Sequence, residues 1–357
     1  MDCLQHGAME SPLARYCPEC GASLAFATID KEPIHRLLPY RDSTLVGYGE
    51  VFFVCDCSGM VHALDANLDD LAEPLSCPDL LSEIAPGAAE GYLYFARSQG
   101  LFVVDLVAWV QDRESEATLL LPAQRIQCML ASGNHVSAVV SVDGSIQLMS
   151  WKGQSVTAQI PLSGFRQDLY TFAPVVTSEF AFVTQRSSNA GTVCVLQDCM
   201  VKEQDLGGAC LHTTASHNGV ACLVESNDKK RIIEFTSSGV TILVPSVPAD
   251  TTWILCGASP ELFLSGNGSS LTLHTNRGHR QYQENGNIGM PSVSNGYANA
   301  IARDAVSSEA LSINLLTGNI GSAGRIGDFS FSEIVCAGNR LVAGNGRQLN
   351  SIAVEKR

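Results

Sequence analysis

A repeated pair of short apolar runs around a glycine constrains the fold of this 357-residue chain more than any other feature. In residues 50–67, an apolar run, a turn and a second alternating run form the pattern of a tight antiparallel hairpin. The pattern returns at 92–106 and 136–151, and in all three copies the glycine (Gly59, Gly100, Gly144) follows the first apolar residue by eight positions. The chain is therefore expected to be built from repeated antiparallel units.

Five looser copies extend the repeat toward the end of the chain, where they begin at Phe180, Val220, Leu262, Tyr297 and Leu341. A period of roughly 40–45 residues, with about four short strands in each, is typical of a β-propeller blade. We therefore expect an all-β fold, a β-propeller over 25–357 with eight blades. Seven is the alternative if the irregular copy at Tyr297 is shared between its neighbours.

The last copy predicts how the ring is closed, because only three residues follow its hairpin at 341–354 and its outer strand is missing. The segment at about 25–38 has room for one strand with no other place in the repeat. We expect this N-terminal strand to pair with the last blade and so to close the ring.

The copy at 51–67, VFFVCDCSGMVHALDAN, resembles the strand–glycine–strand unit of quinoprotein-like (PQQ-like) propeller repeats. The whole chain is similar to β-propellers with quinoprotein-like or WD40-like repeats. The three tryptophans are not followed by Asp, and the tryptophan-docking pattern of quinoprotein dehydrogenases is missing. The resemblance therefore implies the fold and not the enzymatic activity.

Residues 1–24 predict a separate small module that binds zinc. Cys3 and His6 stand two residues apart, as do Cys17 and Cys20 within the sequence CPECG, and this resembles the paired knuckles of a zinc ribbon. Two intervening residues let both side chains of a pair reach one ion, and four ligands complete a tetrahedral structural site. We expect one structural zinc ion, which would supply most of the folding free energy of so short a segment.

The charge is uneven as well as negative. A formal charge of −14 argues against nucleic acid as a partner. Residues 42–90 contain ten Asp or Glu and no Lys or Arg. A solvated face that keeps the protein soluble is one interpretation. The other is a docking patch for a protein partner with a basic surface, with the candidates Asp65, Asp69, Asp70, Glu73, Asp79 and Glu83.

The sequence predicts a cytoplasmic protein. No apolar run reaches the about 20 residues that span a bilayer, and no basic start followed by an apolar run indicates export. The thirteen cysteines are scattered singly through apolar strands and are expected to be small buried residues (Cys128, Cys194, Cys210, Cys222, Cys256, Cys336). Cys55 and Cys57 could form a redox pair, but packing is the favoured interpretation.

Other candidates for chemistry are weak in the sequence. The pairs His212/His217 and His274/His279 lack a third metal ligand at suitable spacing, and surface or strand-end positions are expected for them. Asp56, Asp143 and Asp304 lie in hairpin turns, where Asp is common without any function, although they could converge on one rim.

The function expected from these features is a non-catalytic protein-interaction scaffold that acts as a subunit of a multi-protein system. An enzyme or small-ligand binder with a site at the axial mouth of the propeller is the alternative. A third hypothesis is that the zinc module contacts nucleic acid or a ubiquitin-like partner. Only Arg15 and Lys31 are basic within residues 1–32, which disfavours nucleic acid.

Overall fold

The structure is a computed structural model, and the residues that it describes are 2–3, 7–8, 27–28, 34–37, 44–48, 51–56, 58–65, 67–81, 83–111, 116–132, 135–176, 180–186, 190–195, 200–216, 219–257, 262–275, 278–283, 287–294, 297–303, 307–315, 320–327, 333–337, 340–344 and 348–355. The chain divides into two compact units. The first comprises Met1–Phe52, Leu64–Asp69 and Leu255–Arg357, and the second comprises Phe53–Ala63 and Asp70–Ile254.

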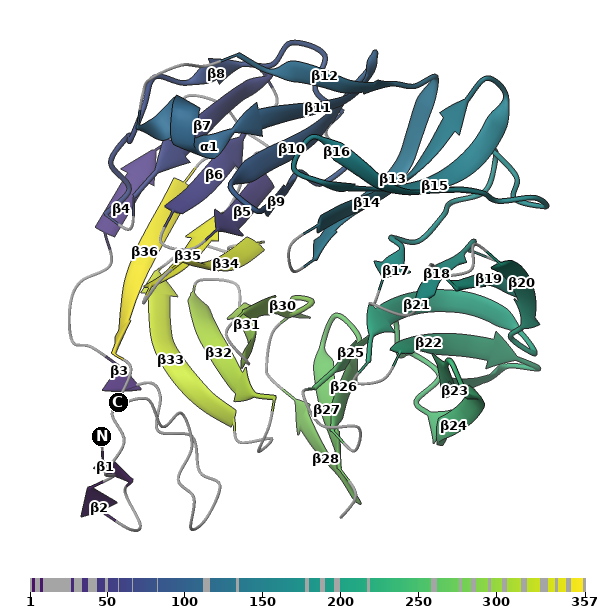
Figure 1. Ribbon diagram of the computed structural model, residues 1–357. Coiled ribbons are helices and arrows are strands. Elements are labelled where there is room, and N and C mark those ends of the chain that lie inside the picture. Colours follow the sequence, from purple (N-terminus) through teal and green to yellow (C-terminus); the bar gives the residue numbers. More distant parts are fainter. Residues whose placement is uncertain are drawn as a thin grey trace. The chain divides into compact units, whose positions relative to one another are not determined.

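The second unit contains four complete antiparallel sheets, each made from four consecutive strands in up-and-down order (Figure 1). In sequence order, these sheets are β9 (Gly87–Ala89), β10 (Tyr92–Arg97), β11 (Gly100–Asp105) and β12 (Thr118–Pro122); β13 (Arg125–Ser132), β14 (His135–Val142), β15 (Ser145–Lys152) and β16 (Ser155–Pro161); β17 (Val175–Val176), β18 (Phe180–Thr184), β19 (Ala190–Val195) and β20 (Met200–Asp205); and β21 (Ala209–Ala215), β22 (Gly219–Ser226), β23 (Lys229–Thr236) and β24 (Gly239–Val247).

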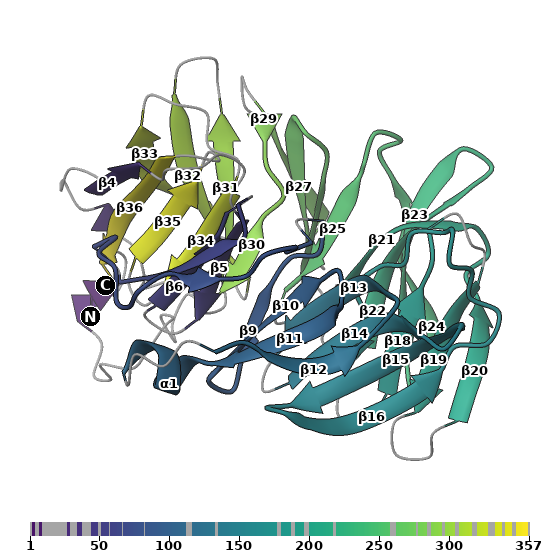
Figure 2. The same cartoon turned by 90° about the horizontal axis from the view of Figure 1, so that it is seen from above.

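The first unit contains three further sheets, the first of which begins where the chain leaves the second unit (Figure 2). Their strands are β25 (Trp253–Cys256), β26 (Phe263–Gly266), β27 (Ser270–Thr275) and β28 (Gly278–Gln283); β29 (Asn287–Ile288), β30 (Ser292–Ser294), β31 (Tyr297–Arg303), β32 (Ser308–Asn314) and β33 (Ile320–Gly327); and β34 (Glu333–Ala337), β35 (Arg340–Gly344) and β36 (Gln348–Glu355) with β3 (Ala27–Thr28) and β4 (Ile34–Leu37).

Two sheets remain. The strands β5 (Thr44–Tyr48), β6 (Val51–Cys55), β7 (Met60–Leu64) and β8 (Leu75–Ser76) form one sheet, through which the boundary between the units runs. A small hairpin of β1 (Asp2–Cys3) and β2 (Gly7–Ala8) is the other. The described residues thus contain eight antiparallel sheets of four or five strands, besides this hairpin.

The hairpin repeat predicted from the sequence is confirmed. Each predicted copy is a pair of adjacent strands in its own sheet: β6–β7, β10–β11, β14–β15, β18–β19, β22–β23, β26–β27, β31–β32 and β35–β36. The N-terminal segment also pairs as expected with the last sheet, since Ile34–Leu37 runs antiparallel to Gln348–Ser351 of β36. The pairing supplies the outer strand that the last repeat lacks.

The core of the second unit lies between successive sheets. One cluster joins the sheet β9–β12 to the sheet β13–β16 and includes Tyr94, Val140 and Trp151. The Tyr94 hydroxyl donates to the backbone oxygen of Gly153 at 2.9 Å, so the buried ring keeps its polar end satisfied. Two further clusters join β13–β16 to β17–β20 and β17–β20 to β21–β24. This face-to-face packing of antiparallel sheets requires apolar residues on both faces of the inner strands.

One described helix, α1 (Leu106–Val110), follows β11. Asp105 caps it by accepting hydrogen bonds from the backbone N–H groups of Val107 and Ala108, because the first N–H groups of a helix have no partner within it. The ring of Trp109 is fully buried and stacks on Phe53 with 5.8 Å between centroids. The sequence did not predict this helix.

Candidate functional site

The predicted zinc ligands lie almost entirely outside the described residues. His6, Cys17 and Cys20 are among the residues not described, and of Cys3 only the backbone in β1 is described. Cys3 pairs with Gly7, the residue that follows His6, in a two-stranded antiparallel hairpin. Within the described residues, no group of three or more His, Cys, Asp or Glu side chains could hold a metal ion. The zinc module remains a prediction.

The structure does not bring the six predicted acidic residues to one edge of their sheet. Asp65, Asp69, Asp70 and Glu73 lie in the link from β7 to β8, whereas Asp79 and Glu83 follow β8, in the link to β9. Consecutive antiparallel links lie at opposite ends of a sheet. Hydrogen bonds agree with this: the N–H of Leu71 donates to Ala63 near the end of β7, and the N–H of Cys77 donates to Gly59 before its start.

The first part of this acidic segment has a structural role. The Asp65 carboxylate accepts hydrogen bonds from the N–H groups of Asn67 and Asp69 and so closes its own turn. Basic residues also lie nearby, since Arg36 donates to the backbone oxygen of Leu68 at 2.6 Å. Burial lowers the pKa of the Arg340 guanidinium, and the negative charge of Asp65 partly opposes that shift.

The later part, residues 70–83, we call the acidic connection; its backbone is held in place by the rest of the second unit. Trp109 of α1 donates its indole N–H to the oxygen of Glu73 at 3.0 Å. Arg97 donates to the oxygen of Pro78 at 2.8 Å, and its guanidinium lies over the ring of Phe102, 4.4 Å from the centroid. The side chain of Arg97 is therefore occupied with the backbone and an aromatic ring.

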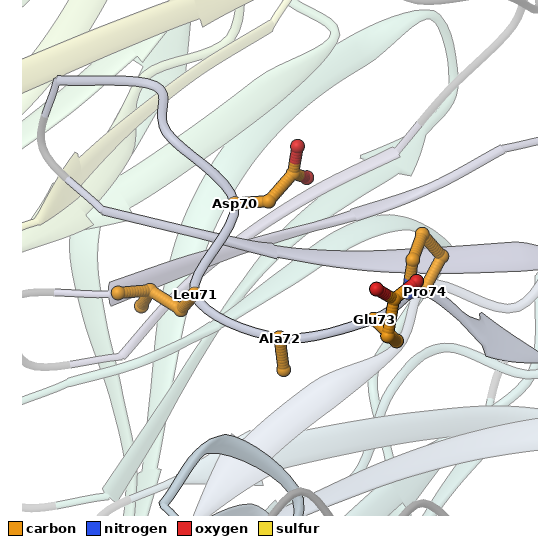
Figure 3. Close-up of a pocket in the computed structure, with 5 residues that line it drawn as sticks. All are labelled: Asp70, Leu71, Ala72, Glu73 and Pro74. Atoms are coloured by element: carbon orange, nitrogen blue, oxygen red, sulfur yellow. The ribbon is translucent and has the colours of Figure 1, made fainter.

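The carboxylates of the acidic connection are exposed on this anchored backbone. The side chains of Glu73, Asp79 and Glu83 are exposed and form no ion pair with the residues that the structure describes. A shallow hollow is lined by Asp70, Leu71, Ala72, Glu73 and Pro74. Figure 3 shows that the Asp70 carboxylate and the Ala72 methyl group point to opposite sides of the chain. A fixed row of exposed carboxylates is a surface that attracts cationic groups.

The turn aspartates do not form a shared site within the described residues. Asp56 is buried, and its Oδ1 atom accepts hydrogen bonds from the N–H groups of Ser58 and Met60, which fix the hairpin turn. Asp143 is exposed in its own turn with φ at 47°. Asp304 lies outside the described residues. These contacts agree with the interpretation of Asp56 as a residue that forms its turn.

His212 is half-buried within β21, where neither a surface nor a strand-end position was found, whereas His274 is buried but lies one residue before the end of β27. Burial lowers the pKa of His212 to about 4, and its Nδ1 accepts from the N–H of Ile254 at 3.5 Å. His274 is buried, stacks on Phe263, and lies 2.8 Å from the Ser265 hydroxyl through Nε2. Burial, and then the nearby His279, lower the pKa of His274 to about 4. His279 is exposed, and His217 is not described.

Two polar pairs were missed by sequence reasoning. The Ser265–His274 pair resembles a nucleophile and its base, but Ser265 is 1% exposed and no carboxylate orients the imidazole in the described contacts. His62 Nε2 lies 3.4 Å from Asp56 Oδ2, with side chains 9% and 1% exposed. Ser265 and His274 lie on the adjacent strands β26 and β27, and His62 of β7 reaches Asp56 in the turn before that strand, so the folded hairpins were needed to find both pairs.

The described cysteines are mostly buried, as predicted. Cys55, Cys128, Cys210 and Cys222 are buried, whereas Cys256 is half-buried. Burial raises the pKa of the Cys128 thiol to about 12 and that of Cys77 to about 11. Because only a thiolate is a good nucleophile, these two residues are inert at neutral pH. Cys57 and the side chains of Cys194 and Cys336 lie outside the described residues.

Comparisons with known proteins support the fold. No protein-family model and no curated protein matches the chain. A solved structure titled Dos1 propeller matches 90% of this chain and 94% of its own, with a TM-score of 0.64 and 11% identity. The apo form of AztD from Citrobacter koseri matches with a TM-score of 0.57 and 14% identity, over 90% of this chain and 96% of its own.

The computationally designed Ika8 protein matches over 90% of this chain and all of its own length, with a TM-score of 0.60 and 12% identity. Likeness at such low identity concerns the fold alone. With the repeated four-stranded sheets, these matches establish that the chain has an all-β, β-propeller fold. No helix in the described residues is long and apolar enough to cross a membrane.

Proposed function

We propose that this protein is a non-catalytic, cytoplasmic protein-interaction scaffold. The observation that carries the proposal is the acidic connection, where Glu73, Asp79 and Glu83 are exposed and have no ion pair among the described residues. The backbone beneath them is held by Trp109 and Arg97. A partner therefore meets a preformed surface and does not have to order it, which lowers the cost of binding.

The partner surface that fits the acidic connection is basic. Carboxylates at a protein surface increase the rate of association with a cationic partner and disfavour anionic ones. Because the links before and after β8 lie at opposite ends of the sheet, Asp70 and Glu73 form one contact region and Asp79 and Glu83 another. Each region is proposed to act by itself.

A structural zinc ion in residues 1–24 is the second part of the proposal. Cys3, His6, Cys17 and Cys20 are the proposed ligands, and the pairing of Cys3 with Gly7 supports a tight hairpin around the first ligand pair. One zinc ion would bind per chain and would stabilise a small module that makes a second protein contact.

We further propose that each of the eight described sheets is one propeller blade. The irregular copy at Tyr297 supports eight over seven, since β31 and β32 lie in a sheet of their own with β29, β30 and β33. The alternative, a catalytic or small-ligand site at the axial mouth, has no support from a metal-binding group among the described residues.

The test is affinity capture of the full chain from native extract of its own cells, followed by cross-linking and mass spectrometry. Two variants separate the two acidic regions: one combines Asp70→Lys with Glu73→Lys, and the other combines Asp79→Asn with Glu83→Lys. Asparagine is chosen at position 79 because its φ is 64°, a backbone conformation that Asn tolerates. The exposed Glu116→Lys serves as the matched charge control.

The proposal is supported if a stoichiometric partner cross-links to residues 70–83 and is lost in one of the two variants but kept in the control. It fails if every folded variant, including the control, retains the same proteins. The same samples are assayed for zinc, and one zinc ion per chain is expected, with loss in a Cys17→Ser, Cys20→Ser variant. An intact chain that contains no zinc would contradict the zinc proposal.

A further inference from the structure

A second exposed surface lies on the link between β16 and β17, residues 162–174. It presents Tyr170, which is 62% exposed although the residues on its C-terminal side, Thr171 and Phe172, are buried. The ring of Tyr170 meets that of Phe172 edge-on, with 5.4 Å between centroids. Tyrosine is among the residues most enriched at the energetically dominant positions of protein interfaces.

The backbone of this link is fixed from two neighbouring sheets. The oxygen of Tyr170 accepts from the N–H of Arg186 at 2.7 Å, and the N–H of Phe172 donates to Thr184 at 3.0 Å. From the sheet β13–β16, the buried Cys128 thiol donates to the oxygen of Phe172 at 3.2 Å. The exposed ring therefore stands on an ordered support.

Buried polar side chains hold the same link. The Thr171 hydroxyl donates to Oε1 of Gln127, and Gln185 donates from Nε2 to Thr171 Oγ1 at 3.1 Å and to the oxygen of Arg166 at 2.7 Å. The N–H of Arg166 donates back to Oε1 of Gln185 at 3.0 Å. A buried network of hydrogen bonds such as this one makes the backbone of the link rigid.

Three exposed arginines, Arg125, Arg166 and Arg186, lie on this link or are hydrogen-bonded to it, in contrast to the negative charge of the chain as a whole. Arg125 donates one hydrogen bond to the oxygen of Gln167 at 2.8 Å, which places it against the link. Arg166 is bound by Asp168 through two hydrogen bonds, of 3.0 and 2.6 Å. The backbone of Arg186 is bound to Tyr170, and its guanidinium forms no ion pair in the described part of the chain.

Acidic groups near the link are few. Asp168 already neutralises Arg166. Glu203 of β20 lies beside Gly164, at the start of the link, where a Cβ on Gly164 would come within 3.1 Å of its Oε1. Arg125 and Arg186 thus retain donors for a ligand, and both are hydrogen-bonded to the link that carries the exposed Tyr170. A guanidinium binds a carboxylate through two parallel hydrogen bonds.

We propose that the link 162–174 is a docking surface for an acidic, partly apolar segment of a protein partner. Carboxylates of that segment bind Arg125 and Arg186, and an apolar side chain packs on Tyr170. The inference rests on the proposed scaffold function and adds a second site of opposite charge to the acidic connection. Nucleic acid fits less well, because two available arginines on a chain of charge −14 provide little attraction for a polyanion.

The test measures fluorescence anisotropy of a short labelled peptide in which Glu alternates with Leu, added to the full chain. A matched peptide with Gln in place of Glu, and a single-stranded oligonucleotide, are titrated in parallel. The variants are Arg186→Glu and Tyr170→Ser, with Lys229→Glu as the control, since Lys229 is an exposed cation at the β22–β23 turn of the same unit. Circular dichroism establishes that each variant is folded.

The expected result is salt-sensitive binding of the Glu peptide that weakens by about tenfold or more in Arg186→Glu and Tyr170→Ser and is unchanged in Lys229→Glu. The variant with Asp70→Lys and Glu73→Lys should bind the peptide at least as well as the wild type, which separates this proposal from the acidic connection. The proposal is overturned if the Gln peptide binds equally, if the oligonucleotide binds more tightly, or if the folded chain binds no peptide.

Discussion

Thr171→Val is the substitution that most directly tests how the buried polar network supports the Tyr170 link. Valine has nearly the shape of threonine, so the change removes the hydroxyl and little else. Thr171 is 1% exposed, Gln127 8% and Gln185 4%, so water does not readily replace the lost partner. The hydroxyl is bound to both glutamines, and the Nε2 atom of Gln127 already has no hydrogen-bond partner.

The magnitude follows from counting these groups. Each lost hydrogen bond costs about 1 kcal/mol, and each buried polar atom left without a partner costs about 1–3 kcal/mol. In Thr171→Val, the Gln185 side chain keeps its hydrogen bond to the backbone oxygen of Arg166. The Oε1 atom of Gln127 loses the hydrogen bond that it accepts from the Thr171 hydroxyl. We therefore expect Thr171→Val to lower the free energy of unfolding by about 2–4 kcal/mol.

A second substitution in the same network makes the reasoning testable. Gln127→Met removes both polar atoms of the glutamine side chain, one of which is already without a partner. Alone it should cost no more than about 1 kcal/mol. In combination with Thr171→Val it should recover about 1–3 kcal/mol, because no orphaned amide remains.

The assay is urea unfolding followed by circular dichroism and tryptophan fluorescence, with coincident transitions required before free energies are compared. Hydrogen exchange of the peptide 166–172, measured by mass spectrometry, reports the local effect directly. Strictly additive losses in the double variant would refute the reasoning, since they would mean that Gln127 is satisfied by other groups or by water when Thr171 is changed.

Three further predictions concern other parts of the chain. Trp109→Phe should cost about 1–2 kcal/mol and speed hydrogen exchange at residues 71–77, because Glu73 loses its hydrogen bond from the indole; unchanged exchange there would exclude Trp109 as an anchor. His274 has a folded pKa of about 4, below its ordinary value, so the unfolded chain binds the proton first and stability should fall as pH drops from about 6.5 toward 4, by at most about 1.4 kcal/mol per pH unit. Acid unfolding measured for His274→Gln should show a shallower slope over that range, and an identical slope would contradict the assignment. Cys128 should resist alkylation at pH 8 in the folded chain and react on unfolding, which peptide mapping after labelling checks.

The hairpins could be predicted because their signals are local. A strand that alternates in burial and a turn that needs a left-handed residue both lie within a few positions. Gly59 has a φ of 81°, and a Cβ on it would lie 2.4 Å from the backbone oxygen of Cys77, so both its conformation and its surroundings require glycine. The pairing of the N-terminal strand with β36 was predictable for a different reason, since the last repeat lacked one strand.

The candidate sites could be predicted only in part, because they depend on which end of a sheet each residue reaches. The acidic residues are close in sequence, yet β8 runs between Glu73 and Asp79 and places them at opposite ends. The sequence gives no sign that so short a segment, Leu75–Ser76, forms a strand. Tyr170 was missed because exposure is a property of the folded link, and its anchors Gln127 and Gln185 are distant in the sequence.

The outer strands of several sheets are protected against pairing with another chain, so the links are better candidates for binding than the sheet edges. An exposed apolar edge strand invites pairing with another chain. The outer strands β12, β16 and β24 expose Leu119, Val156 and Ile242, and each shows a shift of register against its neighbour. A bulge bends the strand and disturbs its free edge, which hinders a further strand from adding.

The outer strands β20 and β28 pair without any shift of register, and they are polar: β20 reads MVKEQD and β28 reads GHRQYQ. Each of these five edges is therefore protected either by a bulge or by polar and charged residues. These five edges are poor sites for an added partner strand, which favours binding through the links. The links at 70–83 and 162–174 suit such binding, because hydrogen bonds to neighbouring elements hold their backbones while charged side chains remain exposed.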